Sequence, residues 1–215
     1  MADYAEDISY KKVVMYYVVG RMVSANDLIV DDLTWAINLS SLQYLDMSSV
    51  DLKATKHLLK VLGKLPSLAE LHLHDCGLNN TNLGATTNYC ANSTLSISNL
   101  QHLDLSYNAL GENFSFCFLH NMTSLSFLDI SSNFLAGTIP SFLGNLRALR
   151  VLGLKSNYLS GPIPSTFGNL RALRVLGLKS NNLFGSIPST LGNLRALRVL
   201  GLGSNNLFLG TTIES

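Results

Sequence analysis

Titratable residues recur at one place in a short apolar pattern of the first half of the chain. Four of them lie between two apolar residues, namely Asp46, His72, Asp104 and Asp129. Since side chains alternate along a strand, each should face water while its neighbours face a core, and the four should form one column across adjacent strands. With His74 and His102 nearby, a metal site is conceivable. We favour a charge-paired ladder and predict no metal.

Aromatic residues are expected to share this exposed face. Tyr44, Tyr107 and Phe127 occupy positions that should point to water, and aromatic side chains of this kind are typical anchors of protein interfaces. We therefore count Tyr44, His72, His74, Tyr107 and Phe127 among the candidate ligand-binding residues.

Basic residues recur in the second half with a fixed spacing. Arg150, Arg174 and Arg198 are expected to form one column and Lys155 and Lys179 another, because adjacent strands lie about 4.8 Å apart. Residues 1–143 carry a charge of −6 and residues 144–215 a charge of +7. Stacked like charges repel, so the columns favour an acidic protein or a polyanionic glycan as partner. The alternative is a basic face that is merely solvated.

Catalytic motifs are absent from the sequence. It contains no glycine-rich phosphate loop with a lysine, no G-x-S-x-G and no H-E-x-x-H, and the column of Asp46, His72 and Asp104 has no evident nucleophile. The arginines are not interleaved with aromatic residues, as nucleic-acid binding would favour. We predict a chain that is not an enzyme, has no cofactor and binds no nucleic acid.

An internal repeat must position all these residues. The fourteen residues Gly144–Asn157 recur unchanged at Gly168–Asn181, and Gly192–Asn205 differs only at Gly203. The spacing of 24 residues and the pattern L-x-x-L-x-L-x-x-N-x-L resemble leucine-rich repeats. Seven copies begin at Leu42, Leu68, Leu100, Leu125, Leu149, Leu173 and Leu197, and a trace of another lies around Leu28–Trp35.

Each repeat position has a physical task. The leucines can leave water only by stacking on neighbouring repeats, which should place Leu152, Leu176 and Leu200 inside one core. The asparagine can satisfy backbone groups of the turn after the strand. We predict an α/β solenoid, a right-handed superhelix with a parallel sheet on its concave face and short 3-10 helices or turns on its convex face. A second signature, L-x-G-x-I-P, follows at Leu135–Pro140, Leu159–Pro164 and Leu183–Pro188.

These motifs resemble the plant-specific leucine-rich-repeat family of receptor-like proteins, receptor-like kinases and polygalacturonase-inhibiting proteins. The segments Val30–Trp35, Leu42–Leu52 and Leu65–Leu73 are most similar to the fungal-xylanase receptor-like proteins of plant immunity. The resemblance covers about residues 26–213. It implies an ectodomain at the plasma membrane that recognises a protein or peptide ligand, signals in defence or development, and works with a co-receptor kinase.

The chain departs from the plan of that family in several ways. It lacks the paired-cysteine cap, the C-terminal cap and the membrane span, so we interpret it as a truncated or fragmentary relative. A secreted inhibitor of a microbial hydrolase and a non-functional gene fragment are the alternatives. Residues 1–25 are assigned to an atypical N-terminal segment that is a poor signal peptide, residues 26–213 to the solenoid and 214–215 to a tail.

Cysteines and sequons fit an extracellular chain. Cys76 replaces a motif asparagine and should be buried, which leaves Cys90 and Cys117 as the more plausible disulfide. Five N-x-S/T sequons predict glycosylation at Asn38, Asn79, Asn92, Asn113 and Asn121.

Overall fold

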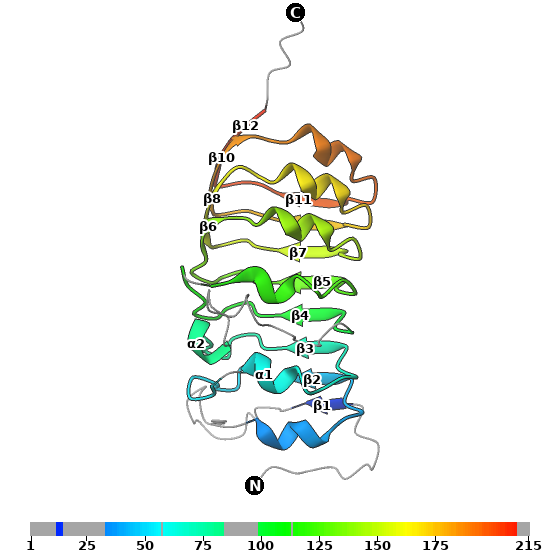
Figure 1. The fold of residues 1–215 in the computed structure, drawn as a ribbon. Helices are drawn as coiled ribbons and strands as arrows, with labels where there is room; N and C mark the ends of the chain where they lie inside the picture. Colours follow the sequence, from blue (N-terminus) through cyan, green and yellow to red (C-terminus); the bar gives the residue numbers. More distant parts are fainter. Residues whose placement is uncertain (1–11, 15–32, 57, 84–98, 113, 210–215) are drawn as a thin grey trace, which may run out of the picture.

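The computed structural model describes residues 12–14, 33–56, 58–83, 99–112 and 114–209. Its main element is an eight-stranded parallel sheet, whose strands stack in chain order from one end of the molecule to the other (Figure 1). The strands are β1 (Lys12–Val14), β2 (Tyr44–Asp46), β3 (Glu70–His72), β4 (His102–Asp104), β5 (Phe127–Asp129), β7 (Val151–Gly153), β9 (Val175–Gly177) and β11 (Val199–Gly201). Each of the seven predicted repeats supplies one strand, which confirms the predicted solenoid.

Strand β1 was not expected. It pairs in parallel with β2, with Val13 opposite Leu45, and so extends the sheet into the segment that the sequence placed before the repeats. It could not be predicted because residues 1–25 lack the leucine pattern.

A second parallel sheet runs along one edge of the solenoid (Figure 1). It contains β6 (Ala136–Thr138), β8 (Tyr158–Gly161), β10 (Asn182–Ser186) and β12 (Asn206–Phe208). Three of these strands come from the L-x-G-x-I-P signature, whose glycines Gly137, Gly161 and Gly185 have φ values of 80°, 79° and 93°. Residues that have a side chain rarely adopt such φ values, which explains why these positions are glycine.

Short helices form a further layer of the solenoid (Figure 1). Among the described residues most are 3-10 helices, as predicted, but two are α-helical. They are η1 (Thr34–Asn38), α1 (Leu58–Leu62), α2 (Asn80–Leu83), η3 (Phe116–Leu119), η4 (Ser141–Asn145), η5 (Ser165–Asn169) and η6 (Ser189–Asn193). Pro140, Pro164 and Pro188 precede η4, η5 and η6 with φ near the −65° that proline imposes, so the ring sets the entry into each helix.

The core is a continuous stack of leucines from successive repeats. Leu152 and Leu176 are in register on adjacent strands and both have 0% exposure. Leu200 is also in register with Leu176, but it is 43% exposed. The expectation that Leu200 lies inside the core is therefore wrong, because no described segment covers β11 on its outer side.

Buried asparagines join each repeat to the next. The side-chain nitrogen of Asn133 donates to the carbonyls of Leu105 in the preceding repeat and of Ile130 in its own, and its oxygen accepts from the Leu110 amide. The buried Asn108, Asn157 and Asn181 and the half-buried Asn205 make the equivalent side-chain bonds. These bonds satisfy backbone groups that would otherwise be buried without partners.

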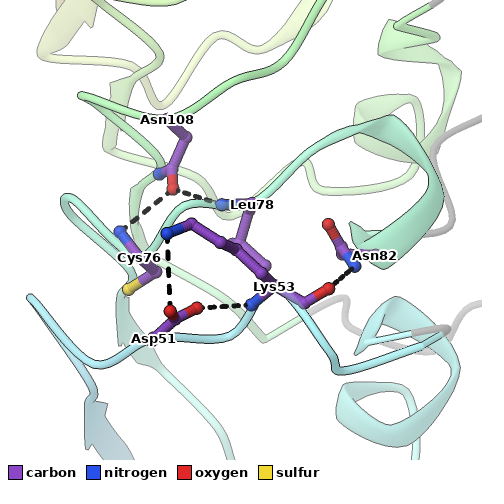
Figure 2. A network of polar contacts seen from close by, with 6 residues as sticks. All are labelled: Asp51, Lys53, Cys76, Leu78, Asn82 and Asn108. Carbon is purple, nitrogen blue, oxygen red and sulfur yellow. Dashed lines mark hydrogen bonds and ion pairs between the residues drawn. The ribbon is translucent and has the colours of Figure 1, made fainter. Parts of the chain in front are cut away.

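Cys76 takes the asparagine position in its own repeat, as predicted (Figure 2). Its thiol donates to the Met47 carbonyl at 3.1 Å, and burial raises its pKa to about 12. Its amide and that of Leu78 donate to the Asn108 side-chain oxygen at 3.1 and 2.9 Å. Cys76 is a buried free thiol with a structural role.

Candidate ligand-binding face

The predicted column of titratable residues exists. Asp46 pairs with His72, His72 with Asp104 and Asp104 with Asp129 on successive strands. The carboxylates are tied to their own turns, since Asp104 accepts from the Ser106 amide at 2.9 Å and Asp129 from the Ser131 amide at 2.8 Å. Their hydrogen bonds therefore fix the chain as it leaves the strand, and only part of each carboxylate is available to a ligand.

Asp46 shows the same arrangement at the N-terminal end of the column. Burial opposes its charge, but hydrogen bonds from the Ser48 amide and hydroxyl and the attraction of His72 outweigh that effect and lower the pKa of Asp46. The Ser48 amide lies 2.9 Å from the Asp46 carboxylate.

An aromatic ladder, made of Tyr44, His72, His102 and Phe127, crosses β2 to β5. Ring centroids are 5.0 Å apart for Tyr44 and His72, 4.3 Å for His72 and His102, and 3.9 Å for His102 and Phe127. Tyr44 and Phe127 are consequently half-buried rather than exposed, which corrects the sequence expectation. Burial and the neighbouring His72 lower the pKa of His102, although Glu70, Asp104 and Asp129 oppose the shift.

His74 and Tyr107 form a separate pair beside the ladder. The His74 Nδ1 lies 2.9 Å from the Ser106 hydroxyl, and its ring centroid is 5.0 Å from that of Tyr107. Tyr107 is 54% exposed and has a φ of 57°, which is unusual for a bulky residue. The histidine trio considered from the sequence does not come together. Glu70 instead lies close to His72 and His102.

The basic columns, Arg150/Arg174/Arg198 and Lys155/Lys179, also take the predicted places. The Arg150 carbonyl accepts from the Arg174 amide at 2.7 Å, and the Arg174 carbonyl accepts from the Arg198 amide at 2.8 Å, so the three arginines are in register. All five side chains are exposed. The ion pairs among the described residues join Lys53 to Asp51 and His72 to Glu70, and neither involves these columns.

Gly153 departs from expectation. Since it lies between Leu152 and Leu154, strand alternation predicts that it faces water. It is instead buried because the Asp129 carboxylate covers it, and a Cβ built at Gly153 would lie 2.5 Å from Asp129 Oδ1. The acidic column thus ends where the basic half begins, and glycine provides the room for its last carboxylate.

Sequence reasoning missed a hollow beside the sheet. It is lined by Ser132, Asn133, Phe134, Ser156, Asn157, Tyr158 and Ser180. The rings of Phe134 and Tyr158 stack at 6.3 Å and are 52% and 55% exposed. Each directly follows a motif asparagine, so an aromatic residue at that position is the signal that could have revealed the hollow.

The structure describes only some of the residues in the cysteine and sequon predictions. Cys117 is disulfide-bonded, but Cys90 lies outside the described residues and the pairing of the two stays a prediction.

Asn38, Asn79 and Asn121 are exposed, whereas Asn92 and Asn113 lie outside the described residues. The Asn79 side-chain oxygen accepts from the Thr81 and Asn82 amides, which leaves the nitrogen that a glycan would occupy free of those bonds. Glycosylation at all five sites stays a prediction.

Comparison with known proteins agrees with the repeat fold. Leucine-rich-repeat family models match residues 99–121, 123–183 and 147–207, about half of the 215 residues. "Receptor-like protein EIX1" of Solanum lycopersicum is 36% identical over 115 residues, which are 53% of this chain and 11% of that protein.

Solved structures of receptors are also similar. A TDR receptor has a TM-score of 0.70 at 29% identity, covering 83% of this chain and 29% of its own. The plant peptide hormone receptor RGFR1, in complex with RGF2, has a TM-score of 0.68 at 32% identity, covering 81% and 26%. The chain therefore spans well under half the length of these relatives.

None of the helices in the described part of the chain has the length and apolarity that crossing a bilayer requires. The repeat pattern, the stacked parallel sheet and the comparisons agree with one another. The chain belongs to the leucine-rich-repeat family, and it is similar to plant receptor-like proteins.

Proposed function

We propose that the chain is the ligand-recognition module of a plant cell-surface receptor-like protein, and that it binds an acidic protein or peptide along the exposed face of the eight-stranded sheet. Defence or developmental signalling outside the cell, through a co-receptor kinase, is the setting that the resemblance favours. In this role the chain is a binding module and not an enzyme. The peptide complex of RGFR1 is a precedent for ligand binding by this fold.

The register of the basic columns is the observation that carries this proposal. Arg150, Arg174 and Arg198 immediately precede the adjacent strands β7, β9 and β11 and are in register, so their charges lie close together. No Asp or Glu occurs between Asp129 and Glu214, so the neighbouring sequence offers them no counter-charge. An acidic ligand that crosses the strands would relieve their repulsion and gain three charge-assisted contacts.

A charge-removal experiment tests the proposal. The triple variant Arg150→Gln/Arg174→Gln/Arg198→Gln should bind a fluorescein-labelled glutamate decapeptide about tenfold more weakly than the unchanged chain in fluorescence anisotropy. Exposed ion pairs contribute about 0.2–1 kcal/mol each, and three of them together reach roughly the 1.4 kcal/mol that corresponds to a factor of ten.

The repeats offer a matched control with the same change in net charge. Arg147, Arg171 and Arg195 are exposed and lie in the same three repeats. Each comes shortly after η4, η5 or η6 and several residues before the strand that follows. Replacing these three with Gln should leave affinity within about twofold. Equal losses in the two triple variants would show that only net charge matters and would refute the proposal. A loss confined to oligogalacturonate, with peptide binding unchanged, would identify a glycan ligand instead.

A further inference from the structure

Three metal-binding groups meet on the exposed face near the N-terminal end of the sheet. Glu70 and His72 are two residues apart on β3 and so point to the same side, and His102 on β4 is the register partner of Glu70. One ligand atom from each of the three residues lies within 4.8 Å of the others. Glu70 is exposed, while the two histidines are half-buried.

His72 has an unsatisfied nitrogen at the centre of this cluster. Its Nε2 is buried and has no hydrogen-bond partner in the described part of the chain. The Glu70 Oε2 is 3.6 Å from that nitrogen, which makes an ion pair but is too far for a hydrogen bond. Buried polar atoms normally have partners, so an unsatisfied one calls for an explanation.

The neighbouring rings hold both histidines in place. Tyr44 packs on the His72 ring, and Phe127 stacks on the His102 ring with an interplanar angle of 4°. His74 does not take part, since its Nδ1 lies against the Ser106 hydroxyl. The cluster therefore presents two fixed imidazoles and one adjustable carboxylate.

In place of the prediction from the sequence that no metal binds, we propose that Glu70, His72 and His102 bind one divalent transition-metal ion, with Zn²⁺ the best fit, and leave a fourth coordination position open to solvent. Two imidazoles and a carboxylate form a ligand set of open zinc sites. Zinc bonds of about 2.0–2.2 Å in tetrahedral geometry separate ligand atoms by roughly 3.3–3.6 Å, so small side-chain rotations close the site. Ca²⁺ and Mg²⁺ prefer oxygen ligands and fit less well.

The open position gives the site a use on a recognition surface. A carboxylate or imidazole of a bound peptide could complete the coordination there. The metal site itself does not depend on the proposed peptide binding, because its three ligands all come from this chain.

Zinc titration of the full chain tests the site. The protein is prepared without a histidine tag, stripped with a chelator and titrated with ZnCl₂ by isothermal calorimetry. One ion per chain should bind, and Co²⁺ in its place should give the visible absorption bands of a tetrahedral complex. The variants Glu70→Gln and His102→Ala should each weaken zinc binding by more than about 100-fold, since loss of a ligand exceeds the 10–100-fold effect of losing an outer-shell partner.

Two control variants make the result specific. His120 is exposed and packs against Phe142 on another layer, and His74 lies outside the cluster, so His120→Ala and His74→Ala should keep the affinity of the unchanged chain. Glu70 is exposed, so Glu70→Gln removes a ligand without disturbing the core. Absence of a one-to-one zinc complex would overturn the proposal, as would equal affinity in Glu70→Gln and the unchanged chain. Zinc alone is the probe, so such a failure leaves the arginine proposal untouched.

Discussion

The substitution Leu176→Ala is expected to lower the free energy of unfolding by about 3 kcal/mol, within the 2–5 kcal/mol range of buried leucine truncations. Leu176 has 0% exposure and lies in register between Leu152 on β7 and Leu200 on β11. Removing its side chain opens a cavity between two repeats that cannot collapse, because backbone hydrogen bonds fix the spacing of the strands. Urea unfolding followed by circular dichroism measures the loss.

The last repeat provides a closely matched control. Leu200 holds the same position in an almost identical sequence, but it is 43% exposed. Leu200→Ala should therefore cost about 1 kcal/mol, since much of its surface is already in water. If the two variants were equally destabilised, stacking between repeats would not be what buries these leucines.

The substitution Asn157→Ala is expected to cost nearly as much, about 3 kcal/mol. The Asn157 side chain donates to the carbonyls of Ile130, Leu154 and Lys155, and it accepts from the Leu135 amide at 3.0 Å. Alanine would leave several of these groups buried without partners, and each such group costs about 1–3 kcal/mol. The same urea experiment gives the value.

Two further variants separate the role of this asparagine from a general effect of its replacement. Asn145 lies in the same repeat but is exposed, so Asn145→Ala should change stability by less than about 0.5 kcal/mol. Asn157→Cys should recover part of the loss, because the Cys76 thiol donates to the Met47 carbonyl in the equivalent place. A loss for Asn157→Ala no larger than that for Asn145→Ala would show that the asparagine bonds contribute little.

The fold could be predicted from the sequence because the repeats stack, so the residue pattern of one repeat must match that of the next. A leucine spaced to face inward in one repeat needs a leucine in the next, so the period alone places Leu152 beside Leu176 and Arg150 beside Arg174. The motif asparagine was equally predictable, because its two donors and its acceptor match the backbone groups of the turn. Strand β1 was not, since its three residues carry no repeat signal.

The details of the candidate site were less predictable. Register places His72 in the acidic column and His102 in the next column, so the contact between them is diagonal and depends on how the side chains lean. Glu70 was overlooked for the same reason. The burial of Gly153 also depends on a neighbour, because the Asp129 carboxylate leans over it. A repeat pattern fixes backbone positions, whereas these contacts depend on side-chain rotamers.

Disulfide trapping of neighbouring columns tests the in-register sheet most directly. In Arg150→Cys/Arg174→Cys the two new cysteines immediately precede the adjacent strands β7 and β9, and their Cα atoms should be about 4.8 Å apart, within the separation of about 4.4–6.8 Å that a disulfide spans. Mild oxidation followed by peptide mass spectrometry should find this bond in most molecules, and in almost none of Arg150→Cys/Arg198→Cys, whose cysteines lie two strands apart. Equal trapping of both pairs, or of neither, would contradict a surface built from repeats stacked in register.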